Sequence, residues 1–239
     1  LEALMKDTGC DCHWFWLQSG QTRINTKINT SPETAFNASG PALAQADVDA
    51  LCAFLRGLTP DDQLVISGNL QKSPQGAFSA LLSAAREAGV SAVVDTSGAA
   101  LREALAFRPL LIKPNGEELC ELFGEQAQTP DALFALAQRA QALGARNVLV
   151  SMGADGALLL AESGDVYRAA LRSTQPVIST VGAGDSVMAG FLAGLLDTGD
   201  YSQALRLGAA CGSATAFCEG LAEGLGCTDP VSSPTFAIL

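Results

Sequence analysis

The chain has 239 residues, 48% of them hydrophobic, enough to bury the core of one globular domain with a small appendage. Its formal net charge of −11 argues against nucleic acid or an anionic membrane as a partner, because both repel an acidic surface. The seven cysteines are odd in number and lie mostly in apolar text, which predicts free thiols in a reducing compartment, the cytoplasm.

The N-terminal residues carry no targeting or metal signal. Residues 1–6 are typical of the end of an amphipathic helix and begin with Leu, so we expect the sequence to start inside a longer protein. Cys10, Cys12 and His13 lack the spacing and the second ligand cluster of a zinc site, which argues against a metal role. The longest apolar helical run, residues 187–196, is too short to span a bilayer, and no export signal precedes it.

Residues 13–36 differ from the rest because they alternate with period two and contain no helix signal. We interpret them as a β-flap that forms a lid on an α/β body made of residues 1–12 and 37–239. Period two places Arg23, Asn25 and Lys27 on one face of a strand. Such a cationic face on an acidic chain fits a lid over a phosphorylated substrate, and a solvated strand face is the alternative.

Beyond residue 60 the sequence alternates short β-rich runs with helical stretches, which is the signature of βαβ units on a parallel sheet. A hairpin with its turn at residues 162–165 then predicts an antiparallel edge, followed by two more helices. The expected strands are residues 64–67, 92–95, 110–113, 147–151, 156–161 and 166–169. The expected helices are residues 74–88, 99–107, one that starts at Thr129 and Pro130 and ends at Gly144, 184–196 and 202–217.

Residues 180–186, Thr-Val-Gly-Ala-Gly-Asp-Ser, carry the strongest chemical signal because they immediately precede a small, apolar helix. Glycines let backbone amides approach a phosphate, and the helix N-terminus adds about half a positive charge. Asp185 would repel that phosphate unless it faces the nucleophilic hydroxyl and accepts its proton. An acid that only complements the helix dipole is the equal alternative from spacing alone.

This segment resembles the C-terminal signature of the ribokinase-like (PfkB) carbohydrate kinases, and other motifs follow in the order of that family. The resemblance implies a three-layer α/β/α fold with a mainly parallel sheet, with ATP and Mg²⁺ as cofactors. It implies Asp185 as the catalytic base and Gly182, Ala183 and Gly184 as the anion hole. The implied nucleotide-binding residues are Lys113, Ser151, Gly153, Gly156, Thr180, Gly182, Gly184, Cys211 and Gly212.

Two further motifs have structural alternatives beside the implied roles. Asn115 and Glu118 resemble the element that organises Mg²⁺ through water, but they also form a capping-box pattern. Residues 95–98, Asp-Thr-Ser-Gly, resemble a segment on the phosphate side of the site, and an Asx turn explains them equally well. Small residues near Cys211 and Gly212 also suit plain helix packing, and Gly153 and Gly156 suit a turn between strands.

The flap pattern resembles the 1-phosphofructokinase branch of the family, which implies D-fructose 1-phosphate as the substrate and a homodimer formed through the lid. Tagatose-6-phosphate and fructose-6-phosphate kinases share the scaffold and remain alternatives. The implied substrate-binding residues are Arg23, Asn25, Lys27, Ser67, Asn69 and Asp185.

The sequence departs from the family in two places. The N-terminal sugar-binding motifs, Asn-Pro-x-x-Asp and Gly-Gly-Lys-Gly-x-Asn, are absent, and residues 67–73 change the usual Ser-Gly-Ser-Leu-Pro-x-Gly turn, with Asn69 in place of a serine. Either the sequence omits residues or the chain is an altered relative that binds ligands without catalysis. A kinase for a neutral sugar or nucleoside is a further alternative, although such a substrate needs no cations such as Arg23 and Lys27 on the lid.

Overall fold

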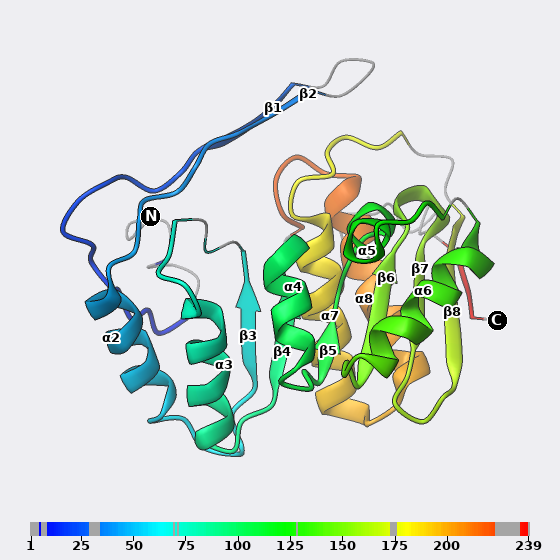
Figure 1. The fold of residues 1–239 in the computed structure, drawn as a ribbon. Coiled ribbons are helices and arrows are strands. Elements are labelled where there is room, and N and C mark those ends of the chain that lie inside the picture. Colours follow the sequence, from blue (N-terminus) through cyan, green and yellow to red (C-terminus); the bar gives the residue numbers. More distant parts are fainter. Residues whose placement is uncertain are drawn as a thin grey trace. The chain divides into compact units, whose positions relative to one another are not determined.

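The computed structural model describes residues 5, 9–28, 34–68, 70, 72–127, 129–172, 176–222 and 235–238 (Figure 1). The chain forms two compact units, the first made of Leu1–Asp62 and Asn69–Val90 and the second of Gln63–Gly68 and Ser91–Leu239. The flap at residues 13–36 belongs to the first unit, and its division from the body as a lid stays a prediction. Residues 1–6, expected to end a helix, lie outside the described residues except for Met5.

The first unit contains a two-stranded antiparallel sheet and two helices. Strands β1 (Asn25–Ile28) and β2 (Thr34–Asn37) pair so that Asn25 lies opposite Asn37. Helices α2 (Gln45–Leu55) and α3 (Ala77–Glu87) pack against each other through buried apolar side chains. The described part of residues 13–36 contains no helix, as the period-two pattern predicted.

The second unit is built on a seven-stranded sheet in the order β3-β4-β5-β6-β7-β8-β9. Neighbouring strands are parallel from β3 to β6 and antiparallel from β6 to β9. The predicted parallel sheet and its hairpin edge are therefore confirmed, while β9 was not predicted. The strands are β3 (Leu64–Ser67), β4 (Ala92–Asp95), β5 (Leu111–Ile112), β6 (Asn147–Ser151), β7 (Ala157–Leu160), β8 (Val166–Arg172) and β9 (Thr235–Ile238).

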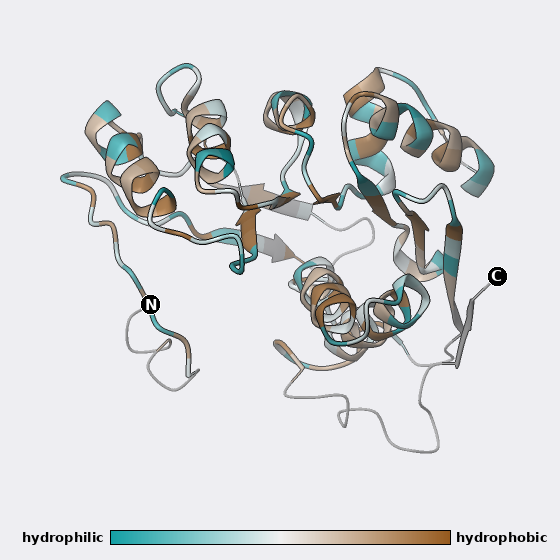
Figure 2. Cartoon of the chain, turned by 90° about the horizontal axis from the view of Figure 1, so that it is seen from below, coloured by the Kyte–Doolittle hydropathy of each residue, from teal (hydrophilic) through white to brown (hydrophobic). Residues whose placement is uncertain are grey.

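Helices cover both faces of this sheet, which confirms the predicted three-layer α/β/α fold (Figure 2). One face carries α4 (Gly98–Leu105), α5 (Gly116–Phe123) and α6 (Pro130–Ala142), and the other carries α7 (Ala183–Thr198) and α8 (Tyr201–Ala216). Helix α6 begins as predicted, because the Thr129 side chain accepts a hydrogen bond from the Ala132 amide at 3.2 Å and Pro130 follows at the first helical position. Among the described residues no helix is long and apolar enough to cross a membrane.

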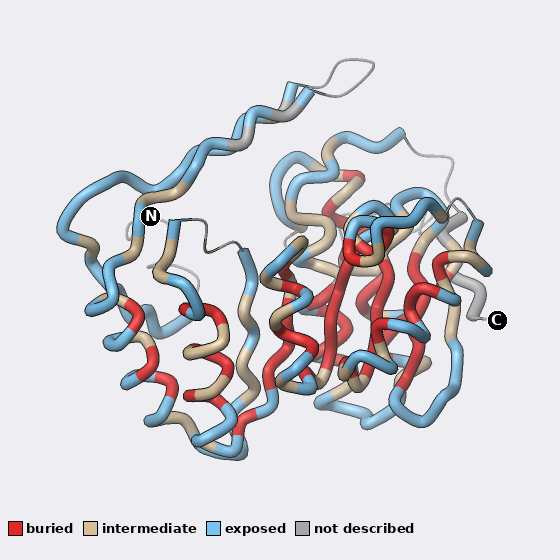
Figure 3. Tube along the Cα trace, viewed as in Figure 1, coloured by how far each residue is buried: buried red, intermediate tan, exposed pale blue. Residues whose placement is uncertain are grey.

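The core lies in the central strands, where the trace is buried along most of its length (Figure 3). Alternate residues of these strands point to opposite faces, so Val93, Leu149 and Leu159 form one cluster with Phe191 and Leu205 of the α7–α8 layer. Full burial of such a side chain contributes about 1.5–3 kcal/mol. This cluster fixes α7, and with it residues 180–186, against the sheet.

Helices α7 and α8 approach each other closely because glycines line their contact. A Cβ atom placed on Gly190 would lie 2.7 Å from the Cys211 sulfur, and one on Gly208 would lie 2.6 Å from the Val187 carbonyl oxygen. Real Cβ atoms do not come so near other heavy atoms, so only glycine allows this separation.

Candidate active site

The polar residues singled out in the sequence gather at one edge of the sheet, where the parallel strands end. Ser67 at the end of β3 lies in register with Asp95 at the end of β4. Asn115, just beyond β5, forms a parallel bridge with Ser151 at the end of β6. In open α/β sheets ligands bind outside the carboxyl ends of such strands, so this edge is the candidate site.

The first turn of α7 lies in the same unit and presents an anion-binding start. The chain turns at Gly182, whose φ of +77° favours glycine. The Ala183 amide donates to the Thr180 carbonyl at 3.3 Å, whereas no acceptor is found in the described part of the chain for the amides of Gly184 and Asp185. These two amides are therefore available to an anion at the positive end of the helix dipole.

Asp185 is exposed in this first turn, where a substrate could reach its carboxylate. A Cβ atom on the preceding residue, Gly184, would lie 3.2 Å from the ammonium nitrogen of Lys113, which follows β5. The first turn of α7, which includes Asp185, therefore lies at the carboxyl edge of the sheet.

Lys113 supplies a buried positive charge beneath the helix start. Its side chain is 7% exposed, and its ammonium nitrogen lies 3.2 Å from Asp95 Oδ1 and 3.2 Å from where a Cβ on Gly184 would be. Burial raises the pKa of Asp95, Lys113 opposes this shift, and Asp185 adds to it. The arrangement places a cation next to the unpaired amides, where an anionic phosphate gains from both.

The pairing of Lys113 with Asp95 was not expected from the sequence. Lys113 was assigned to the nucleotide and Asp95 to the phosphate side, each without a partner. The signal that could have found the pair is topological, because Asp95 ends β4 and Lys113 follows β5, the adjacent parallel strand. Such residues meet at the same edge of a sheet.

Asn115 and Glu118 form the capping box that the residue types allow. Asn115 Oδ1 accepts from the Glu118 amide and Glu118 Oε2 accepts from the Asn115 amide, both at 2.8 Å. The structural interpretation of this motif is confirmed, and its role toward Mg²⁺ stays a prediction. Within the described residues no group of three or more His, Cys, Asp or Glu side chains forms a metal cluster.

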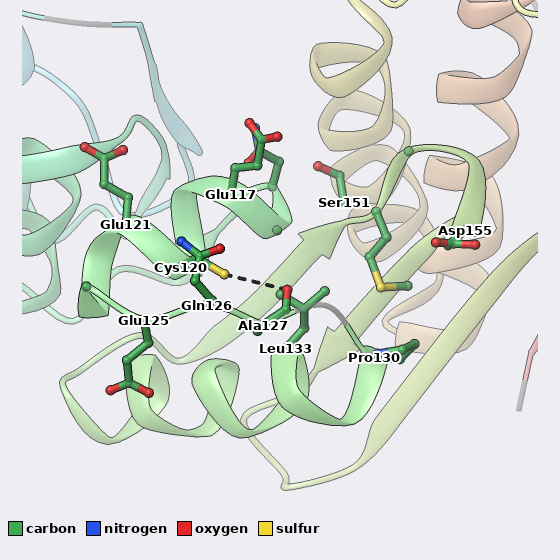
Figure 4. Close-up of a pocket in the computed structure, with 15 residues that line it drawn as sticks. Glu117, Cys120, Glu121, Glu125, Gln126, Ala127, Pro130, Leu133, Ser151 and Asp155 are labelled. Carbon is green, nitrogen blue, oxygen red and sulfur yellow. Dashed lines mark hydrogen bonds between the residues drawn. The ribbon is translucent and has the colours of Figure 1, made fainter.

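The loop from Ser151 to Gly156 reverses the chain between β6 and the antiparallel β7, as the turn interpretation required. Gly156 has φ +90° and ψ −129°, a conformation that essentially only glycine adopts. Ser151 and Gly153 also line, with Asn115, a pocket of about 950 Å³ beside α5 (Figure 4). Whether the loop contacts a nucleotide stays a prediction.

The rim of this pocket is acidic, which limits what it can hold. Glu117, Glu121, Glu125 and Asp155 all line it. Four carboxylates repel phosphate groups, so this pocket does not favour an anionic ligand.

On α8 the two predicted nucleotide residues differ in surroundings. Cys211 lines a small pocket of about 230 Å³ together with Ser186 and Thr215, and burial raises the pKa of its thiol. A Cβ on Gly212 would lie 2.3 Å from Val187 Cγ2, so this glycine serves the close contact of the helices. Among the described residues, Cys12, Cys52, Cys120 and Cys211 are free thiols.

The flap residues are only partly described. Arg23, Asn25 and Lys27 were expected on one face of a strand. Strand β1 begins at Asn25, so Arg23 lies two residues before the strand, and the expectation was wrong for this residue. The strand starts late because pairing with β2 ends at the Asn25–Asn37 pair. Lys27 lies in β1 but its side chain, like the whole of Asn69, falls outside the described residues.

Comparison with known proteins identifies relatives that match most of the chain. The sequence profile of pfkB family carbohydrate kinases matches residues 1–225. The chain is 38% identical over 203 residues to the 1-phosphofructokinase of Bacillus subtilis, covering 84% of this chain and 66% of that protein. It is 33% identical over 207 residues to the D-tagatose-1-phosphate kinase of Bacillus licheniformis, covering 85% of this chain and 67% of that protein.

Among solved structures, phosphofructokinase-2 from Escherichia coli in complex with potassium superimposes with a TM-score of 0.77 at 31% identity, covering 85% of this chain and 68% of the other. The chain thus spans about two thirds of the length of its curated relatives.

Proposed function

Because the chain belongs to the pfkB family of carbohydrate kinases, we propose that it transfers the γ-phosphoryl group of ATP to a hydroxyl of a sugar phosphate. The single observation that carries this proposal is the cation and amide arrangement at the start of α7. Lys113 lies beside Gly184, the amides of Gly184 and Asp185 have no acceptor among the described residues, and the Asp185 carboxylate stands in the same turn.

The proposed chemistry separates two tasks between neighbouring groups. The Gly184 and Asp185 amides and the Lys113 ammonium stabilise the charge of the transferring phosphoryl group. The Asp185 carboxylate accepts the proton of the attacking hydroxyl as the new bond to phosphorus forms. Gly182 and Ala183 shape the turn, and Thr180 holds it through its carbonyl oxygen.

The residues present fit ATP and Mg²⁺. Mg²⁺ in such sites keeps several waters and takes one or two carboxylates plus substrate phosphates, so a dedicated cage is not required. We assign Asn115 and Glu118 to contact the ion through water, beside the capping box that they form. When bound, the ion neutralises the phosphates of ATP.

We propose Ser151, Gly153 and Gly156 at the ribose side of the nucleotide and Cys211 with Gly212 beside its base. Support comes from two pockets, one lined by Ser151 and Gly153 and the other lined by Cys211.

For the acceptor we propose D-fructose 1-phosphate. Support comes from relatives named 1-phosphofructokinase at 32–38% identity over most of this chain. Arg23, Asn25 and Lys27 of the flap, with Ser67 and Asn69, are the residues we assign to the sugar phosphate. A ketose-phosphate kinase of another specificity is the second candidate, favoured by the relative named D-tagatose-1-phosphate kinase.

We also propose a cytoplasmic homodimer formed through the flap. Support comes from apolar side chains that stay exposed there, among them Trp16 at 74%, Ile24 at 79% and Phe36 at 59%. The free thiols of Cys12, Cys52, Cys120 and Cys211 agree with a reducing compartment.

The test of the proposed chemistry is the isosteric change Asp185→Asn, assayed with MgATP and D-fructose 1-phosphate in the native full-length protein. Loss of a general base is expected to lower kcat by about 10²–10⁴-fold while MgATP still binds, because the amides remain and a repulsive charge has gone. Asp197→Asn, near the other end of α7, is the matched control and should leave kcat unchanged.

Two outcomes would contradict the proposal. A folded Asp185→Asn variant that retains more than about a tenth of wild-type kcat would show that Asp185 only complements the helix dipole. Wild-type protein that binds MgATP but transfers phosphate to none of the fructose and tagatose phosphates would favour the non-catalytic relative.

A further inference from the structure

A buried hydroxyl on α8 joins the first turn of α7 to the segment that follows α8. Thr215 is 1% exposed, and its Oγ1 lies 2.8 Å from Ser186 Oγ and accepts a hydrogen bond from the Ala222 amide at 3.3 Å. A hydroxyl has one proton and two lone pairs, so it can serve both partners at once. Ser186 directly follows Asp185, so this contact is one residue from the proposed base.

The segments around this hydroxyl enclose the turn at Gly182. A Cβ on Gly182 would lie 2.4 Å from Cδ2 of Leu221, which precedes Ala222 in the chain. The Ile178 amide donates to the carbonyl of Ala216, the next residue of α8, at 2.8 Å. The end of α8 therefore contacts three parts of the chain: the residues before the Gly182 turn, the segment at Ala222, and the first turn of α7.

The glycine contact between the helices makes this hydroxyl pair important for orientation. Gly190, Gly194, Gly208 and Gly212 bring α7 and α8 together through backbone and small side chains, which restrict distance but offer few directional contacts. A hydrogen bond has a preferred distance and angle, so the Thr215–Ser186 pair can fix the rotation of the first turn where packing does not.

We propose that Thr215 is a positioning residue for phosphoryl transfer. Its hydroxyl holds Ser186, and through it keeps the Gly184 and Asp185 amides and the Asp185 carboxylate aligned with the reacting groups. The inference rests on the proposed function. Thr215 acts through Ser186 and does not touch the reacting atoms.

The experiment replaces Thr215 with Val, which keeps the side-chain shape and removes the hydroxyl. Loss of one neutral hydrogen bond from the aligned state is expected to lower kcat by about 3–10-fold, with KM for both substrates within about twofold of wild type. Thr215→Ser should restore kcat. Ser186→Ala should lower kcat similarly, and the double variant Ser186→Ala/Thr215→Val should fall no further, because one shared contact is lost.

Thr198→Val is the matched control at the opposite end of α7. Thr198 Oγ1 donates to the Gly194 carbonyl at 2.7 Å and accepts from the Asp200 amide at 3.1 Å, so this variant also loses two hydrogen bonds. It should lower the melting temperature and leave kcat unchanged. If Thr215→Val and Thr198→Val lose the same stability but only Thr215→Val lowers kcat, Thr215 has a positioning role beyond a merely structural one.

Amide hydrogen exchange decides the inference independently of turnover. In Thr215→Val the hydrogen-bonded amides of Ala183 and Ser186 should exchange faster than in wild type and in Thr198→Val. If wild type transfers no phosphate, the proposed function fails while this measurement still tests the positioning. Unchanged exchange at these amides, or a Thr215→Val variant with wild-type kcat, would overturn the inference.

Discussion

Replacement of Lys113 by Met tests the buried ion pair beneath the helix start. The pair has side chains only 7% and 15% exposed, so water screens it little. Met has a similar shape but leaves the Asp95 carboxylate without its cation. Breaking a buried pair from one side costs about 3–5 kcal/mol, and we expect a loss of that order in the free energy of unfolding at about pH 8.

The loss should shrink as the pH falls. Burial already raises the pKa of Asp95 above its unfolded value while Lys113 lowers it, so removal of Lys113 raises that pKa further. A raised folded pKa means that the protonated form is favoured in the folded protein, and the stability gained by protonation is lost as the pH rises through that pKa. Asp95 therefore has a higher pKa in the folded variant than in the folded wild type. Between these two pKa values, the difference in the free energy of unfolding between wild type and variant should change by at most about 1.4 kcal/mol per pH unit.

Urea unfolding without ligands, at about pH 5 and pH 8, measures both effects. The control Arg56→Met breaks the exposed pair with Glu87, whose 2.7 Å contact has both side chains more than half exposed, and should cost far less than loss of the buried pair. Lys113→Met/Asp95→Asn should recover part of the stability, because the unpaired carboxylate is gone. A loss below about 1 kcal/mol at pH 8, or one that is the same at both pH values, would refute the reasoning.

Two further predictions concern the flap. If Arg23 binds the sugar phosphate as proposed, Arg23→Ala removes a charge-assisted contact worth about 1.5–3 kcal/mol. Steady-state kinetics should then show KM for the sugar phosphate about tenfold to a hundredfold higher, with KM for ATP unchanged. The reverse pattern would show that Arg23 serves the nucleotide. Ile24→Ser and Trp16→Ser should each weaken the homodimer by removing exposed apolar surface, as sedimentation at micromolar concentration would show, and a wild-type protein that is only monomeric there would contradict the proposed interface.

Sequence patterns predicted strands and helix starts well where a single local signal determines the element. Strands β3, β4 and β6 match their predicted bounds because runs of branched apolar residues are flanked by turn signals. Strand β5 is shorter than expected, with two residues instead of four. Pro114 has no amide proton to donate, so regular pairing is interrupted there and resumes only as the single bridge between Asn115 and Ser151.

The contacts that build the candidate site were less predictable because they depend on which strands are neighbours. Asp95 and Lys113 were each singled out, yet their ion pair follows only from the adjacency of β4 and β5. Strand β9 pairs with β8 although its residues carry no clear period, since backbone pairing alone can recruit a strand to an edge. Thr215 gave no sequence signal, because its role depends on its distance to Ser186.

The glycine-lined contact between α7 and α8 has a mechanical consequence. Because a Cβ atom at Gly190 or Gly208 would already clash with the facing helix, the two backbones lie close together there and neither helix can slide along the other without a clash. The two helices should therefore move as one rigid lever, and any motion that carries Asp185 toward or away from a substrate must carry α8 with it. Spin labels on the exposed faces of the two helices would report a constant separation while ligands come and go.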